Sequence, residues 1–105
     1  MNAFDLLKKM PAAVIPEAID GIDCTVQLNI SRPTHVRIVD GVCTVHEGVA
    51  SDPDVSLTMS DDNLVALMTG KLSGVMAFMT GKLKVDGDLM LAKEIPNSFD
   101  TAKLA

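Results

Sequence analysis

The pentapeptide Met-Thr-Gly-Lys-Leu occurs twice in this sequence of 105 residues, at residues 68–72 and again at residues 79–83. Gly70 and Gly81 can adopt the left-handed conformation that ends a helix, and the lysine after each glycine places positive charge beside the last carbonyl groups. The repeat therefore predicts two short helices, each of which ends at a Gly-Lys pair.

Five consecutive apolar residues, 75–79, lie between the two glycines. On a helix, an unbroken apolar run points in every direction, so this segment has no side that suits water. We expect it to be covered on all sides, either by other parts of the protein or by a ligand.

The length and composition are those of one domain, comprising residues 1–105, with a single core. Apolar residues make up 48% of the chain, yet there are only three Phe, no Trp and no Tyr, whereas Met occurs seven times. A core rich in flexible thioethers and poor in rigid rings can adapt its shape. This composition suits either an adaptable packed core or a binding site for a variable apolar ligand.

The net charge of −5 and the lack of a basic cluster argue against nucleic acid, or an anionic membrane surface, as the main partner. At most a transient membrane contact is expected. Charged residues and Pro11 interrupt the N-terminal segment, and no apolar run is long enough to span a bilayer. We therefore expect a cytoplasmic location.

Strands are predicted first along the chain. Apolar and polar residues alternate over residues 22–30, which is typical of a strand with one dry face. Asp40-Gly41 is a strong hairpin signal between two further strands. The five predicted strands comprise residues 22–30, 35–39, 42–46, 54–60 and 82–86.

Helical patterns dominate after residue 60. Ser60 can cap a helix with apolar residues Leu64, Leu67 and Met68, and a last helix begins near residue 89 and cannot continue unkinked past Pro96. A short helix at residues 2–9, expected to stop near Pro11, precedes the strands. The order of elements predicts an α+β fold with a five-stranded, mainly antiparallel sheet.

The sequence contains no recognisable catalytic motif. The Gly-Lys pairs lack the earlier glycine and the following Ser or Thr of a phosphate-binding loop, and neither G-x-S-x-G nor H-E-x-x-H occurs. His35 and His46 are expected on strands that flank the hairpin, without a metal role. Cys24 and Cys43 have no metal-ligand spacing and are expected to be reduced, buried thiols. We predict a protein that is not an enzyme and has no metal or cofactor.

The apolar content exceeds what one sheet face needs. Three apolar segments compete to cover it: residues 64–68, residues 75–79, and residues 89–95 together with Phe99. Either they pack into one tight core, or they enclose a cavity that a ligand fills. Both interpretations fit, because periodicity shows which residues avoid water and not what they contact.

A longer pattern resembles a known family. It reads Asp54-x-x-Leu57-x-Met59-Ser60, then Leu64-x-x-Leu67-x-x-Gly70-Lys71-Leu72, and then Ala77-Phe78-x-x-Gly81-Lys82-Leu83-x-Val85-x-Gly87-Asp88 and Ala92. In this pattern, over about residues 16–95, the chain resembles the sterol carrier protein-2 domain. The resemblance implies helices over one face of the sheet, an apolar tunnel between the helices and the sheet, and a C-terminal segment that acts as a lid.

The resemblance further implies non-enzymatic binding, and intracellular transfer, of a fatty acid, acyl-CoA, phospholipid or isoprenoid. Sterol itself is not expected, because the chain resembles the stand-alone prokaryotic-type members. An alternative is an accessory or interaction module for an enzyme that acts on lipid-soluble substrates such as quinone precursors. The residues expected to line the tunnel are Leu57, Met59, Leu64, Leu67, Met68, Met76, Phe78, Met79, Leu83, Leu89 and Met90.

Two features depart from the family pattern. Peroxisomal members end in Ala-Lys-Leu, a sequence read by an import receptor, whereas here Ala102-Lys103-Leu104 is followed by Ala105. Pro96 interrupts the last helix and changes the direction of the proposed lid.

Overall fold

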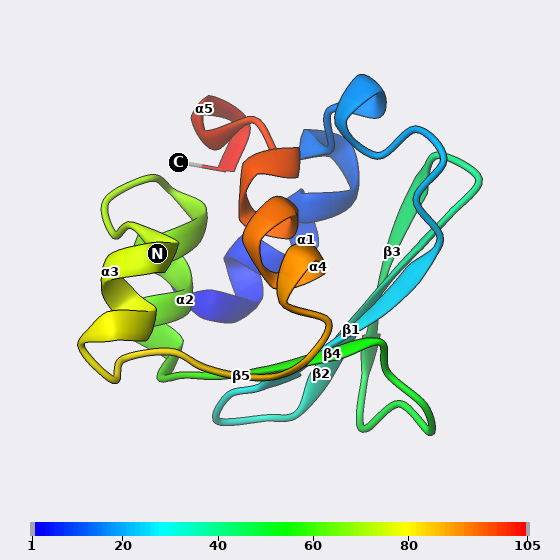
Figure 1. Ribbon diagram of the computed structural model, residues 1–105. Helices are drawn as coiled ribbons and strands as arrows, with labels where there is room; N and C mark the ends of the chain where they lie inside the picture. The colour runs from blue at the N-terminus through cyan, green and yellow to red at the C-terminus, as the bar shows by residue number, and fades with distance from the viewer. Residues whose placement is uncertain (1, 105) are drawn as a thin grey trace.

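The computed structural model describes residues 2–104 and contains a five-stranded sheet with helices on one side (Figure 1). The strand order is β3-β2-β1-β4-β5, and all neighbouring pairs are antiparallel except β1 and β4, which are parallel. The strands are β1 (Cys24–Asn29), β2 (Thr34–Val39), β3 (Val42–Glu47), β4 (Val55–Thr58) and β5 (Lys84–Gly87). The predicted α+β class and mainly antiparallel sheet are confirmed, although β4 is shorter than expected and β5 begins two residues later.

The predicted hairpin joins β2 to β3. Asp40 and Gly41 have φ values of 53° and 76°, and Val39 pairs with Val42. Two consecutive residues with positive φ form the two-residue turn whose twist matches that of the flanking strands. The sequence Asp-Gly therefore fixes the register of this half of the sheet.

One face of the sheet is dry, as the alternation predicted. Cys24, Val26 and Leu28 are buried on β1, and Ile38 of β2 lies between Cys24 and Cys43 in register. Both thiols are free and buried, which confirms that expectation.

Gln27 departs from the alternation, because it was expected on the wet face but is only 2% exposed. Its Nε2 donates to the carbonyls of Thr34 and Gly48 at 3.3 and 3.4 Å, and its Oε1 accepts from the backbone N–H of Ala50 at 2.8 Å. The loop after β3 is thus hydrogen-bonded to Gln27 and buries it.

The helices form the second layer (Figure 1). They are α1 (Ala3–Ala13), η1 (Pro16–Ala18), α2 (Asp61–Met68), α3 (Gly74–Met79), α4 (Leu89–Glu94), η2 (Ile95–Ser98) and α5 (Thr101–Leu104), where η denotes a 3-10 helix. The main hydrophobic core lies between this layer and the dry face of the sheet.

The first helix is longer than predicted and includes Pro11. Proline has no backbone N–H, so Pro11 removes one hydrogen bond from the last turn of the helix. The packing of neighbouring side chains can offset part of this loss. Met10 and Ala13, on either side of Pro11, are 2% and 1% exposed. Burial of these two side chains therefore carries the helix past the residue expected to stop it.

The repeated pentapeptide adopts the same conformation twice, as predicted. Gly70 and Gly81 have φ values of 81° and 76°. The N–H of Lys71 donates to Ala66 and that of Lys82 to Ala77, both at 2.8 Å, across the end of the helix. These bonds define the glycine-terminated helix end in which the residue after glycine reaches back five positions.

The C-terminal segment is anchored to the end of α1. Phe99 forms an isolated bridge with Val14, and the N–H of Asp100 donates to the carbonyl of Ala13 at 2.8 Å. Phe99 and Leu104 are 3% and 0% exposed. The last helix was expected not to continue unkinked past Pro96; α4 ends at Glu94, and Pro96 lies in the first turn of the 3-10 helix η2.

Candidate functional site

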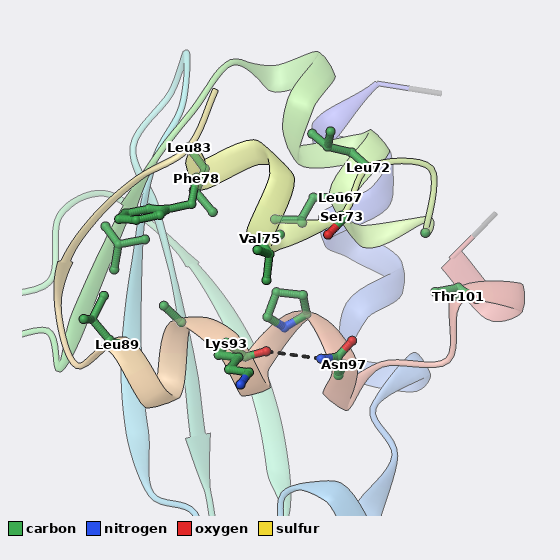
Figure 2. A pocket seen from close by; sticks show the side chains of 15 residues that line it. Leu67, Leu72, Ser73, Val75, Phe78, Leu83, Leu89, Lys93, Asn97 and Thr101 are labelled. Carbon is green, nitrogen blue, oxygen red and sulfur yellow. Dashed lines mark hydrogen bonds between the residues drawn. The ribbon is translucent and has the colours of Figure 1, made fainter. Parts of the chain in front are cut away.

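A cavity of about 540 Å³ opens between α3 on one side and α4 with η2 on the other (Figure 2). Its lining residues are Leu67, Gly70, Leu72, Ser73, Gly74, Val75, Phe78, Leu83, Val85, Leu89, Ala92, Lys93, Pro96, Asn97 and Thr101. Most of these side chains are apolar. The volume lies within the range of about 300–1,000 Å³ that is usual for small-molecule sites.

The local structure of the repeated segment positions one wall. Ser73 caps α3 by accepting a hydrogen bond from the N–H of Met76 at 3.4 Å. A Cβ on Gly74 would lie 3.6 Å from Cδ1 of Leu67, so the start of α3 packs closely on α2. Val75 and Phe78 then extend from α3 into the space above α4, where Leu89 points back toward them (Figure 2).

The opposite wall combines apolar and polar side chains. Ala92 and Pro96 contribute apolar surface, and Lys93, Asn97 and Thr101 contribute polar groups. Asn97 is already engaged, because its Nδ2 donates to the carbonyl of Lys93 at 3.2 Å. The segment after α4, which the resemblance assigned as a lid, thus forms part of a cavity wall.

Four of the predicted lining residues are brought together at this cavity: Leu67, Phe78, Leu83 and Leu89. Four others, Leu57, Met59, Leu64 and Met68, are buried in the core but do not line the cavity. The remaining three, Met76, Met79 and Met90, are exposed, and Met90 lines a smaller hollow beside Ala18.

The protein itself covers α3 on one side only, so of the two expected kinds of cover, protein or ligand, the protein supplies only part. Ala77 is its only buried residue, whereas Phe78 is 53% and Met79 74% exposed. The glycine-terminated turns on either side hold this short helix at the rim of the cavity, where Ala77 is buried and the half-exposed Val75 and Phe78 line the opening. An apolar sequence therefore did not imply burial here.

Five apolar lining residues were not among those expected: Leu72, Val75, Val85, Ala92 and Pro96. Leu72 had a usable signal, because it occupies the same place in the first pentapeptide that Leu83 occupies in the second. Pro96 was interpreted only as a helix breaker, and its packing role has no signature in the sequence.

The buried cysteines lie outside the cavity. Burial, reinforced by the carboxylates of Asp54, Asp23 and Asp88, raises the pKa of the Cys24 thiol to about 11. Burial, with a smaller contribution from Cys24, raises the pKa of Cys43 to about 11 as well. Neither thiol is set up as a nucleophile, because a nucleophilic cysteine needs a lowered pKa and access.

The two histidines stack across the β2–β3 hairpin, with ring centroids 5.1 Å apart. Nδ1 of His35 lies 3.2 Å from the carbonyl oxygen of Gly48, and Nε2 of His46 lies 2.9 Å from Oγ1 of Thr44. Within residues 2–104, no three His, Cys, Asp or Glu side chains are grouped as a metal site would require.

Comparison with known proteins identifies the family. Residues 4–100 match the model of the SCP-2 sterol transfer family. The chain belongs to that family. It is 32% identical over 94 residues to peroxisomal multifunctional enzyme A of Dictyostelium discoideum, and 48% identical over 62 residues to sterol carrier protein 2 of Bos taurus.

These SCP-2 relatives are much longer than the chain. The match to the Dictyostelium enzyme covers 84% of this chain but 21% of that protein, and the bovine match covers 59% of this chain and 11% of that protein. In contrast, the solution structure of palmitated SCP2L2 from Aedes aegypti matches over 92% of this chain and 93% of its own. The TM-score is 0.75 and the sequence identity 25%.

The description of the family names sterol transfer. Across residues 2–104, no helix combines the length and apolarity needed to cross a bilayer. Ala105, which follows Ala102-Lys103-Leu104 in the sequence, lies outside the described residues.

Proposed function

We propose that the protein binds one lipid molecule and holds its acyl or isoprenoid chain in the 540 Å³ cavity between α3 and α4. The observation that carries this proposal is the cavity's apolar lining, to which α2, α3, α4 and the start of β5 all contribute. No His, Cys, Asp or Glu is among the described residues that line the cavity, and its polar side chains are those of Ser73, Lys93, Asn97 and Thr101.

The binding free energy expected for an acyl chain is compatible with a lipid carrier. Each buried methylene contributes about 0.8 kcal/mol, so a chain with about sixteen of them gains roughly 13 kcal/mol. Association costs at least about 4 kcal/mol. At this minimum cost the net gain is about 9 kcal/mol, which corresponds to a dissociation constant just below the micromolar range, and any larger cost weakens binding from there. The palmitated state of the Aedes relative supports an acyl chain as the ligand.

Binding is tested with the purified full chain and a fluorescent fatty acid. The sequence contains no Trp or Tyr, so the probe is read against little intrinsic emission. We expect saturable binding at one site, competition by unlabelled palmitate, and co-purified lipid in native mass spectrometry. No saturable binding together with no co-purified lipid would overturn the proposal.

A second candidate is an accessory module for an enzyme that acts on lipid-soluble substrates, such as quinone precursors. It is favoured by the match to a multifunctional enzyme of which this chain spans 21%. A tagged chain that recovers such an enzyme, and raises its rate on a lipid substrate, would support this role. Tight lipid binding with no recovered enzyme would instead support a lipid carrier that acts without a partner enzyme.

A further inference from the structure

The strand β5 forms one edge of the sheet. Within residues 2–104 it pairs with β4 alone, at the end of the order β3-β2-β1-β4-β5. An edge strand presents backbone N–H and C=O groups that no neighbouring strand satisfies, and so it can serve as a template for a further strand. Lys84, Asp86 and Gly87 are exposed, so this edge is open to solvent.

The hydrogen bonds between β4 and β5 indicate which backbone groups of β5 face outward. The N–H of Asp88 donates to the carbonyl of Asp54 at 3.0 Å. In an antiparallel pair, every second residue along a strand bonds to the neighbouring strand. Asp86 and Lys84 therefore bond to β4, whereas Val85 turns its N–H and C=O toward the free edge. Val85 is thus the residue around which another strand can pair.

The charges of β5 are complementary to those of the same strand running in reverse. Lys84 and Asp86 lie on either side of Val85, and both are exposed. If two β5 strands pair antiparallel with Val85 at the centre, Lys84 of each copy lies directly opposite Asp86 of the other. Opposite charges at directly opposed positions stabilise a strand pair, and like charges destabilise it. The sequence Lys-Val-Asp is therefore self-complementary in this register.

Exposed apolar side chains flank β5 at both ends. Phe78 and Met79 at the end of α3 precede the strand, Leu89 and Met90 at the beginning of α4 follow it, and all four are more than half exposed. Figure 1 shows that α3 and α4 connect to opposite ends of β5. Antiparallel pairing would bring the end of α3 in one copy toward the beginning of α4 in the other. Apolar surface that is exposed in a single copy would then be buried.

We propose that the chain forms a dimer in which two β5 strands pair antiparallel about a two-fold axis at Val85, so that the two sheets become one. This inference goes beyond the proposed lipid binding and does not depend on it. The same groups serve on both sides of the interface, as in most protein dimers. An axis perpendicular to the sheet leaves the helical layers of both copies on the same side. Because the paired segment is short, we expect a weak, concentration-dependent dimer.

A second copy fits this edge better than other occupants do. The strand at the opposite edge, β3, contains Glu47 and no Lys or Arg, so two β3 strands offer each other no opposite charge. An extended peptide from another protein is the alternative occupant of β5. A second copy is favoured over such a peptide because Lys84 and Asp86 flank the outward-facing residue symmetrically, which matters only when the strand meets itself.

The association is measured by sedimentation equilibrium of the full chain without added lipid. We expect the average mass to rise from 11.1 kDa toward twice that value as the protein concentration increases. A mass of 11.1 kDa at every concentration up to about 1 mM would overturn the proposal.

A charge swap tests the register. Lys84→Asp places aspartates opposite each other, and Asp86→Lys places lysines opposite each other, so each should weaken the dimer by about tenfold or more. The double variant restores opposite charges in the reverse order and should recover the affinity of the unmodified chain to within about threefold. Lys8→Asp on α1 makes the same change in net charge and should leave the dimer unchanged. A double variant that stays monomeric, or an equal loss in Lys8→Asp, would overturn the pairing of Lys84 with Asp86.

A pair of double variants tests the apolar contribution. Met79→Ser with Met90→Ser removes exposed side chains at the two ends of β5, and Val42→Ser with Val49→Ser removes exposed apolar residues elsewhere. Only the first double variant should weaken the dimer, by about tenfold. Equal effects would overturn the contact between α3 of one copy and α4 of the other.

Failure of the dimer and failure of the carrier function are distinguishable. A monomer that binds the fluorescent fatty acid would overturn the dimer and keep the carrier function, whereas a dimer that binds no fatty acid would do the reverse. All of the substituted side chains are exposed. At a concentration low enough for every variant to be monomeric, their melting temperatures should therefore match that of the unmodified chain.

Discussion

Gly87 passes so close to Asp54 that a Cβ on Gly87 would lie 2.5 Å from the Asp54 carbonyl oxygen. The same carbonyl accepts a hydrogen bond from the N–H of Asp88 at 3.0 Å, and the Asp54 carboxylate accepts one from the N–H of Thr25 at 2.7 Å. This contact ties β5 to the centre of the sheet at the point where the chain turns into α4. It thereby positions one wall of the cavity.

Replacing Gly87 by alanine is expected to destabilise the fold strongly. The substitution combines a φ of +108° with a backbone clash that no side-chain rotation relieves, which together should cost about 3 kcal/mol or more. Gly81→Ala is the matched control, because Gly81 has a φ of +76° with nothing within 4 Å of its Cβ position. That control should lose about 1–2 kcal/mol in urea unfolding. Equal losses in the two variants would contradict the close approach.

The two thiols predict a decline of stability at alkaline pH. Cysteines with an ordinary pKa of 9.0 ionise in the unfolded chain, whereas the buried native thiols of Cys24 and Cys43 stay protonated until about pH 11. Their contribution to stability is therefore complete below pH 9 and lost as the pH rises from about 9 through 11. The Cys24→Ala, Cys43→Ala variant should show a shallower decline in the free energy of unfolding over that interval.

Native thiols should also resist labelling. A thiol reagent at neutral pH is expected to modify neither cysteine until the chain is unfolded, because both are buried and protonated. Rapid labelling of both in the native protein would contradict the register that places Cys24 and Cys43 on either side of Ile38.

Asp61 links the start of α2 to the end of β1 and should contribute to acid sensitivity. Hydrogen bonds from the hydroxyl and the N–H of Ser31 hold the pKa of its carboxyl below the ordinary 3.8. This stabilisation is present above pH 3.8 and is lost as the pH falls through the lowered pKa. Asp61→Asn should therefore flatten the acid limb of the stability curve, measured by urea unfolding. An acid limb that Asp61→Asn leaves unchanged would contradict this contribution.

Local features of the sequence determined much of the fold. The Asp40-Gly41 turn and the two Gly-Lys helix ends depend on conformations that few residues adopt, so a short motif was sufficient to predict each. Strand alternation likewise predicted the buried face of β1. It failed at Gln27, because a distant loop folds over that side chain and satisfies its amide.

The cavity was only partly predictable. Its position depends on how far α3 lies from α4, a tertiary distance that leaves no period in the sequence. The apolar run in α3 was expected to be covered by protein or by a ligand, and the sequence did not indicate that the protein would leave most of it exposed. Leu64 and Met68 were recognised as apolar and expected to line the tunnel, but they are buried in the core and do not line the cavity.

Two neighbouring residues on α3 provide the sharpest test of where the lipid lies. Val75 and Met76 are 59% and 55% exposed, but only Val75 lines the cavity. Because both are exposed, Val75→Phe and Met76→Phe should each leave the melting temperature of the lipid-free protein nearly unchanged. Val75→Phe should reduce the space available to an acyl chain, whereas Met76→Phe should not.

If the larger ring displaces about two methylene groups of the ligand, Val75→Phe should weaken binding of a long-chain fatty acid by about tenfold. Short chains that do not reach the ring should bind almost as before, and Met76→Phe should bind both like the unmodified chain. Competition titrations over a series of chain lengths measure the difference. Equal effects of the two substitutions would place the ligand outside the cavity. Val75 and Met76 are exposed to a similar degree and differ in that only Val75 lines the cavity, so a ligand inside the cavity must respond to them differently.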